Sequence, residues 1–370
     1  MDHAKQGDFA KGLQDIDEAI RLKPIDPTAY VYRSEIFDLK GDPEQALASL
    51  SQAIKAAPKD PMGHMYRGSY RLRRGEVEEA IADLDESLRL DPQSAAALMH
   101  RGNAYLALGE YDKAIEDLNE GVLVSHKAPE LYIARGTVLL EKGDVAGAFA
   151  DFNHALLLRP NDPMLLARRG YAQLRQGNIA LALADLDEAI RVNPAEAYFY
   201  MWRGSVLIAT NQLDKALTDV NHAIELKPKE ALFYSLRGFL YTKQESYQKA
   251  VQEFERAIAL NPGGQEGYNN LAWLRATCPS GEFRDGPEAV RLATKAAELT
   301  RFSLAPIVDT LAAAYAEAQD FEKAIKYQKS CLELIAGSKS KPNDEMRSRL
   351  ELYQNHKPFH QPPPGTVAAH

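Results

Sequence analysis

The sequence predicts an all-α solenoid, a stack of helix–turn–helix repeats, and three observations carry that prediction. A proline, replaced once by histidine, recurs every 34 residues, and a fixed period of this size is typical of a copied supersecondary motif. Small residues recur at fixed distances before it, and the apolar residues between them follow helical spacing. Such a repeat cannot bury its apolar face alone, so each copy completes its core against its neighbours. The recurring positions are Pro24, Pro58, Pro92, His126, Pro160, Pro194, Pro228 and Pro262.

Within each repeat the sequence predicts a first helix, a tight turn and a second helix. The closing proline ends the second helix, because it lacks an N–H and disfavours helical geometry in the residue before it. A glycine such as Gly143 follows the first helix, where a left-handed cap is expected. Asn211 can adopt that conformation at the equivalent place, whereas Glu245 fits it poorly. Small residues such as Ala148 allow the two helices to approach closely.

The N-terminal part of the chain predicts a partial repeat followed by regular ones. Residues 1–26 form a partial first repeat, because Gly7-Asp8-Phe9 already occupies the turn between two helices. Met1 then falls inside a first helix, so we expect either a half-repeat cap or further sequence upstream, and favour the second. Residues 27–264 form seven regular 34-residue repeats.

The C-terminal part departs from the period. Residues 265–336 predict two divergent repeats, with an inserted loop at 277–286 whose role the sequence leaves open. The second helix resumes at Pro287, which suits the first turn of a helix. Residues 342–356 predict an amphipathic capping helix, and residues 357–370 an extended, proline-rich tail.

These residues resemble the tetratricopeptide repeat (TPR) family, of the bacterial type, over almost the whole chain. The family pattern places an aromatic residue and glycine in the first helix, alanine and an aromatic residue in the second, and proline at the end. The resemblance implies a right-handed superhelix whose first helices line a concave groove. Two repeats carry the pattern clearly, through Tyr132, Gly136, Ala148, Phe152, Ala155 and Pro160, and through Tyr234, Gly238, Tyr241, Tyr247, Ala250, Phe254, Ala257 and Pro262.

Composition narrows the classes of partner. The net charge is −8 and the pI near 5.7, so the chain lacks the basic footprint of a nucleic-acid-binding repeat protein, and we expect no nucleic-acid partner. Cys278 and Cys331 have no metal-ligand spacing around them, and we expect neither metal nor cofactor. No apolar run is long enough to insert into a membrane. The compartment stays open, cytoplasmic or exported if an upstream signal is missing, and so does the oligomeric state.

Charged residues also recur with the period. An arginine precedes the glycine of most first helices, and an acidic residue lies nine residues before most closing prolines. We expect a ladder of arginine–carboxylate contacts between helices in preference to an anion-binding strip, because partly buried charges persist only when paired. The sequence leaves open whether Asp83 meets Arg67 or Arg101.

The TPR resemblance implies which first-helix positions contact a ligand. Several are methionines, whose flexible side chains suit varied peptides; the alternative is that they pack between adjacent first helices. A chaperone-type carboxylate clamp is disfavoured, because Met99 stands where that clamp needs lysine. The predicted peptide-binding residues are Met62, Met65, Met99, Asn103, Met164, Tyr171, Tyr198, Met201 and Phe239, with Ser69, Ile133, Thr137, Ser205 and Trp273 at equivalent places.

Catalysis finds little support in the sequence. His154 and His222 occupy equivalent places in second helices, which favours packing roles, and Cys278 is the one candidate nucleophile, with a bystander thiol favoured. We therefore predict a non-enzymatic scaffold that binds peptide segments or partner proteins in its concave groove. The alternative is a regulatory or substrate-recruiting arm of a larger enzyme whose catalytic domain lies upstream of Met1.

Overall fold

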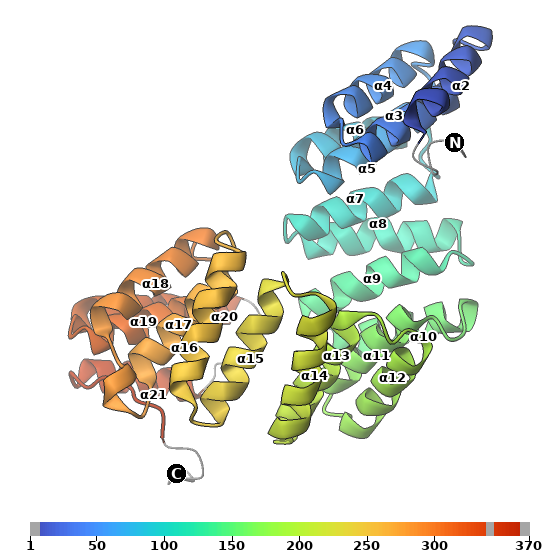
Figure 1. Ribbon diagram of the computed structural model, residues 1–370. Coiled ribbons are helices and arrows are strands. Elements are labelled where there is room, and N and C mark those ends of the chain that lie inside the picture. Colours follow the sequence, from blue (N-terminus) through green and yellow to red (C-terminus); the bar gives the residue numbers. More distant parts are fainter. Residues whose placement is uncertain (1–7, 338–343, 363–370) are drawn as a thin grey trace. The chain divides into compact units, whose positions relative to one another are not determined.

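The computed structural model describes residues 8–337 and 344–362, and every regular element in these ranges is a helix (Figure 1). The predicted all-α stack of helix–turn–helix repeats is thereby confirmed. The chain forms two compact units, an N-terminal unit (Met1–Ala189) and a C-terminal unit (Ile190–His370). The helices that begin in the N-terminal unit are α2 (Phe9–Leu22), α3 (Pro27–Lys40), α4 (Pro43–Ala56), α5 (Pro61–Arg73), α6 (Val77–Leu90), α7 (Ala95–Ala107), α8 (Tyr111–Val124), α9 (Pro129–Lys142), α10 (Val145–Leu158), α11 (Pro163–Arg175) and α12 (Ile179–Val192).

The C-terminal unit continues the helix pairs and ends in a single helix. Its elements are α13 (Ala197–Ala209), α14 (Leu213–Leu226), α15 (Ala231–Lys243), α16 (Tyr247–Leu260), α17 (Gln265–Thr277), the short 3₁₀ helix η1 (Gly281–Phe283), α18 (Gly286–Leu299), α19 (Ala305–Glu317), α20 (Phe321–Gly337) and α21 (Asp344–Gln354).

Each first helix packs against the second helix of its own repeat and against the helices next to it. In the N-terminal unit α3 packs on α4, α5 on α6 and α7 on α8, and the first helices α3, α5, α7 and α9 also contact one another in order. In the C-terminal unit α15 contacts α17, and α17 contacts α19. First helices therefore form a continuous row within each unit, and second helices lie behind them.

Local sequence fixes where the helices begin and end. Asp60 accepts a hydrogen bond from the backbone N–H of Met62, and Pro61 occupies the first turn, where its missing N–H is no loss. First helices end at a residue with positive φ, which glycine adopts without strain. In two later repeats that residue is Asn211, at φ 56°, or Glu245, at φ 58°.

Glycine and alanine inside the helices set the close approach of each pair. A Cβ added to Gly136 would lie 2.8 Å from the ring of Phe152, and one added to Gly238 would lie 2.5 Å from Phe254. Ala148 is fully buried in the core beside Phe152. The period of small residues is thus a period of helix–helix contact.

The insertion after α17 is an ordered corner. Asp285 caps α18 by accepting a hydrogen bond from the Glu288 N–H. The Arg284 guanidinium donates to the carbonyl of Cys278 at 2.7 Å and to Glu317 at 3.1 Å, so it ties the corner to α19. A Cβ added to Gly286 would lie 2.6 Å from the backbone nitrogen of Ala318, which explains a glycine there.

The helix α21 closes the C-terminal unit. Its Tyr353 is fully buried against alanines of α19 and α20. Its Arg349 pairs with the buried Asp309, with nitrogen–oxygen distances of 3.1 and 2.8 Å. Residues 357–362 follow without helical structure, and the rest of the expected tail lies outside the described residues, as does the expected first helix before residue 8.

Candidate peptide-binding surfaces

The recurring arginines form an internal ladder. Arg101 on α7 binds Asp117 of its own repeat through two nitrogens, at 2.8 and 2.7 Å, and Asp85 of the preceding second helix at 2.7 Å. Asp83 accordingly meets Arg67 and not Arg101. Each arginine therefore joins helices, and its charge is neutralised within the stack. The same pairing holds for Arg135–Asp151, Arg169–Asp185, Arg203–Asp219 and Arg237–Glu253.

The histidines at equivalent places pack on tyrosines. The His154 ring lies 4.1 Å from that of Tyr132 between centroids, and the His222 ring lies 4.5 Å from that of Tyr200. The Tyr132 hydroxyl donates to the carbonyl of His126 at the end of the preceding helix, at 3.1 Å. These side chains support the stack, as their repeating register indicates.

Four predicted ligand-contacting methionines are partly or wholly used in packing. Met62, Met65 and Met99 lie half-buried against the apolar clusters of their own repeats. Met201 is only 8% exposed, because it lies within the core beside α13's aromatic residues. The structure thus leaves little of Met201 for a ligand, and we do not retain it in the proposed site.

The aromatic residues on first helices are more accessible. Phe239 on α15 is 38% exposed, with the Lys243 ammonium 5.4 Å above its ring. Tyr198 is half-buried, and its hydroxyl donates to the carboxylate of Glu230 at 2.8 Å. That hydrogen bond raises the pKa of Tyr198 to about 12, so the hydroxyl stays protonated. The half-buried Met164, Asn103 and Tyr171 also lie on first helices.

Arg168 on α11 is the functional candidate that the sequence analysis missed. Its Nη1 donates to the Thr137 hydroxyl on α9 at 3.2 Å, and its buried Nε has no hydrogen-bond acceptor. Among the residues that the structure describes, no carboxylate lies within ion-pair distance of it, and burial lowers the pKa of its guanidinium. Comparison at the 34-residue period could have found it, since Tyr66, His100, Ala134, Trp202 and Leu236 hold the equivalent places.

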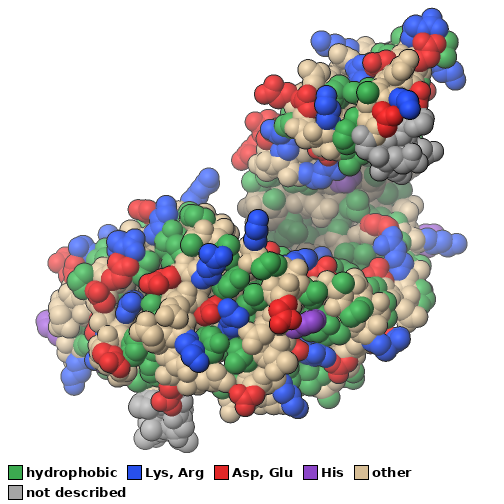
Figure 2. All heavy atoms as spheres, in the orientation of Figure 1, with side chains coloured by type: hydrophobic (Ala, Val, Ile, Leu, Met, Phe, Trp, Pro, Cys, Tyr) green, Lys and Arg blue, Asp and Glu red, His purple; other side chains and the backbone are tan. Residues whose placement is uncertain are grey.

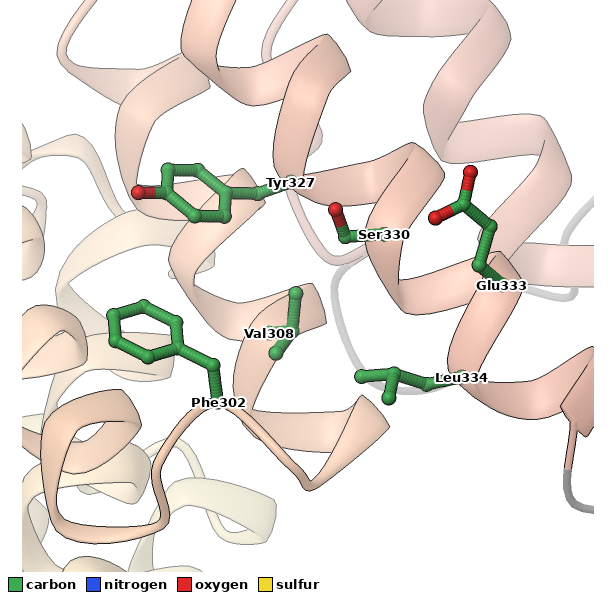
Figure 3. Close-up of a pocket in the computed structure, with 6 residues that line it drawn as sticks. All are labelled: Phe302, Val308, Tyr327, Ser330, Glu333 and Leu334. Atoms are coloured by element: carbon green, nitrogen blue, oxygen red, sulfur yellow. The ribbon is translucent and has the colours of Figure 1, made fainter.

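A cavity of about 590 Å³ lies in the last repeat (Figure 3). Phe302 reaches it from the α18–α19 turn and Val308 from α19, while Tyr327, Ser330, Glu333 and Leu334 come from α20. Phe302 stacks on Tyr327 at 6.3 Å between centroids, and both Arg301 and Phe302 have positive φ. This volume falls in the range of small-molecule sites. Its mainly apolar lining suits an aliphatic or aromatic group.

Chemistry-bearing residues are otherwise unremarkable. Cys278 and Cys331 are buried free thiols, and burial raises the pKa of Cys331 to about 12, so neither is an activated nucleophile. In the described part of the chain no group of acidic, histidine and cysteine residues could hold a metal ion. None of the described helices combines the length and apolar character needed to cross a bilayer. Acidic and basic side chains are interspersed over the face in Figure 2.

Comparison with known proteins follows the same repeats. Models described as tetratricopeptide repeat match residues 1–61, 65–129, 101–163, 167–231, 231–263 and 306–337. A search of curated proteins found no match.

Solved structures share the fold. A tetratricopeptide repeat protein from Parabacteroides merdae is 23% identical, with a TM-score of 0.53, over 65% of this chain and 94% of its own. Yeast Tom70 is 15% identical, with a TM-score of 0.52, over 96% of this chain and 93% of its own. Since the repeat models cover most of the sequence, this chain belongs to the tetratricopeptide repeat family, whose members are in general non-catalytic scaffolds for protein interaction.

Proposed function

We propose that the chain binds partner proteins through an extended acidic segment laid across the first helices of the N-terminal unit, with Arg168 as its anchor. The single observation that carries this proposal is the unneutralised guanidinium of Arg168. A partly buried charge without a counterion is unfavourable, because burial removes water that nothing replaces. A carboxylate supplied by a partner would complete this site.

The neighbouring Arg169 makes the contrast clear. Arg169 binds Asp185 through two nitrogens, at 2.7 and 2.6 Å, and Asn153 through a third at 2.8 Å. Two adjacent arginines on one helix therefore differ in state: Arg169 is fully used within the stack, whereas Arg168 bonds only to Thr137. Structural need accounts for the first arginine and not for the second.

The surroundings of Arg168 favour a peptide over a free ion. Met164 and Tyr171 stand four residues before and three after it, so the three side chains share one face of α11. The bond to Thr137 places this face beside the first helix α9, where Ile133 lies one turn before Thr137. A partner segment with a carboxylate between apolar residues matches this arrangement of one cation among apolar side chains. The guanidinium fork can hold that carboxylate through two hydrogen bonds.

Fluorescence anisotropy with labelled ten-residue peptides tests the proposal. Peptides that combine glutamate or aspartate with leucine or phenylalanine should bind, more weakly as salt rises, and glutamine-for-glutamate versions should not. Arg168→Gln should weaken binding at least tenfold, because a charge-assisted pair is lost. The matched control is Arg175→Gln, an exposed arginine at the end of the same helix, which should leave binding unchanged.

Thermal unfolding separates binding from a structural role. Because Arg168 is desolvated without a counterion, Arg168→Gln should leave the melting temperature unchanged or raise it. A large fall in stability, or acidic and neutral peptides that bind equally well to both proteins, would contradict the assignment.

A further inference from the structure

The chain itself places an extended segment on its first helices. Residues 357–362, here called the C-terminal segment, leave α21 and cross α19 to reach α17. The Gln361 N–H donates to the carbonyl of Thr277 on α17 at 2.8 Å, and His360 Nε2 lies 2.7 Å from a carboxylate oxygen of Glu317 on α19. The Phe359 ring lies 6.1 Å from that of Trp273, between centroids.

Phe359 is the anchor of this contact. The Arg349 guanidinium lies 5.2 Å from the Phe359 ring and 5.5 Å from the Trp273 ring, so both rings contact the same cation. Phe359 also packs on the apolar cluster that contains Tyr353 and Ala316. An aromatic side chain thus fills a site made of a second aromatic ring, a cation and small residues, a combination that favours aromatic groups.

The covered surface is equivalent to a predicted ligand-contact position. Trp273 lies 34 residues after Phe239, so it holds in α17 the place that Phe239 holds in α15. Thr277 lies one helical turn beyond Trp273 on the same face. The C-terminal segment therefore lies where the TPR resemblance implies that a ligand would lie.

We propose that the Trp273 surface is a second peptide-binding site, and that the C-terminal segment is its built-in occupant. The partner is an extended segment of another protein that carries an aromatic residue next to proline, as Pro358 and Phe359 do here. Proline keeps such a segment extended before it binds, which lowers the entropy lost on binding. The partner displaces the C-terminal segment and takes over the Phe359 position. This inference extends the proposed function to the C-terminal unit and does not depend on Arg168.

The segment is held less firmly than the helix before it. Within the described residues its polar contacts to α17 and α19 are one backbone hydrogen bond and the His360–Glu317 pair, in which the His360 side chain is 35% exposed. Exposed ion pairs contribute little to stability. By contrast α21 is fixed by the buried Arg349–Asp309 pair and by Tyr353. The segment can therefore detach while α21 stays docked.

Competition with a synthetic copy of the segment tests this inference. The probe is a fluorescein-labelled peptide of residues 355–364, and the proteins are the full chain and a chain ending at His356. The truncated protein should bind the probe at least tenfold more tightly, because the tethered competitor is absent. A probe carrying Phe359→Ala should not bind. Arg168→Gln should leave these affinities unchanged, so failure here and failure of the acidic site are distinguishable.

A variant of the full chain guards against misfolding of the truncated one. Phe359→Ala in the full chain should also expose the site to the probe, and Trp202→Phe makes Trp273 the sole tryptophan whose emission reports release. Lys357→Ala, at an exposed position, is the matched control and should change nothing. Equal probe binding by the full chain and both opened variants would overturn the inference. So would dimerisation of the full chain that Phe359→Ala abolishes, because the occupant would then be a second copy's segment.

Discussion

Glu245 has a backbone conformation that its side chain disfavours. It ends α15 at φ 58°, where five other first helices end in glycine with φ between 75° and 91°. An L-residue in this region loses about 1 kcal/mol relative to glycine. We predict that Glu245→Gly raises the free energy of unfolding by about 1 kcal/mol, measured by urea denaturation. The reciprocal control, Gly177→Glu, should lower it by a similar amount, and an unchanged midpoint for Glu245→Gly would contradict this account.

Single residues were predictable from the sequence only where the period repeats them. The left-handed position of Glu245 follows from the glycines at equivalent places, and so does the burial of Ala148. The burial of Met201 was not predictable, because the period places a residue on a helix face without giving its depth. The isolation of Arg168 was equally hidden, since it depends on which acidic side chains come near in space.

At the scale of helices, the arginine ladder contains two kinds of ion pair. Arg101 holds the buried Asp117 within its own repeat and the exposed Asp85 of the preceding one, with side-chain exposures of 7% and 53%. Removing Asp117 leaves Arg101 without its buried partner, whereas water replaces Asp85. We predict that Asp117→Ala lowers the free energy of unfolding by about 3 kcal/mol, and Asp85→Ala by less than about 1 kcal/mol. Both are measured by denaturant unfolding, and equal losses would refute the distinction.

Helix-level organisation was largely accessible from the sequence, and the choice of partner was not. Recurring arginine and aspartate residues indicated a ladder, but Asp83 lies 16 residues after Arg67 and 18 before Arg101. Spacing along the chain alone cannot choose between them, because the crossing of the helices decides. The C-terminal segment was predicted only as extended. Its return to α17 involves residues beyond the last repeat, where no period constrains the chain.

At the scale of the whole molecule, a stack of repeats distributes stability along the chain. Each helix contacts only those near it in sequence, and no distant helices share a core within either unit. Stability in such a protein approximates a sum over repeats and their nearest-neighbour interfaces. A local defect should therefore have a local effect, in contrast to a globular domain with one core.

Ala148→Leu tests this distribution. Ala148 is fully buried in α10 beside Phe152 and Ala172, so a larger side chain overpacks the interface by about 1–3 kcal/mol. Hydrogen exchange of the variant should be faster in α9, α10 and α11 and unchanged in α17 and α19. Ala148→Gly is the matched control for loss of helix propensity without overpacking. Equal acceleration in all helices would show that the chain unfolds as one cooperative body, and would contradict stability set by neighbouring repeats.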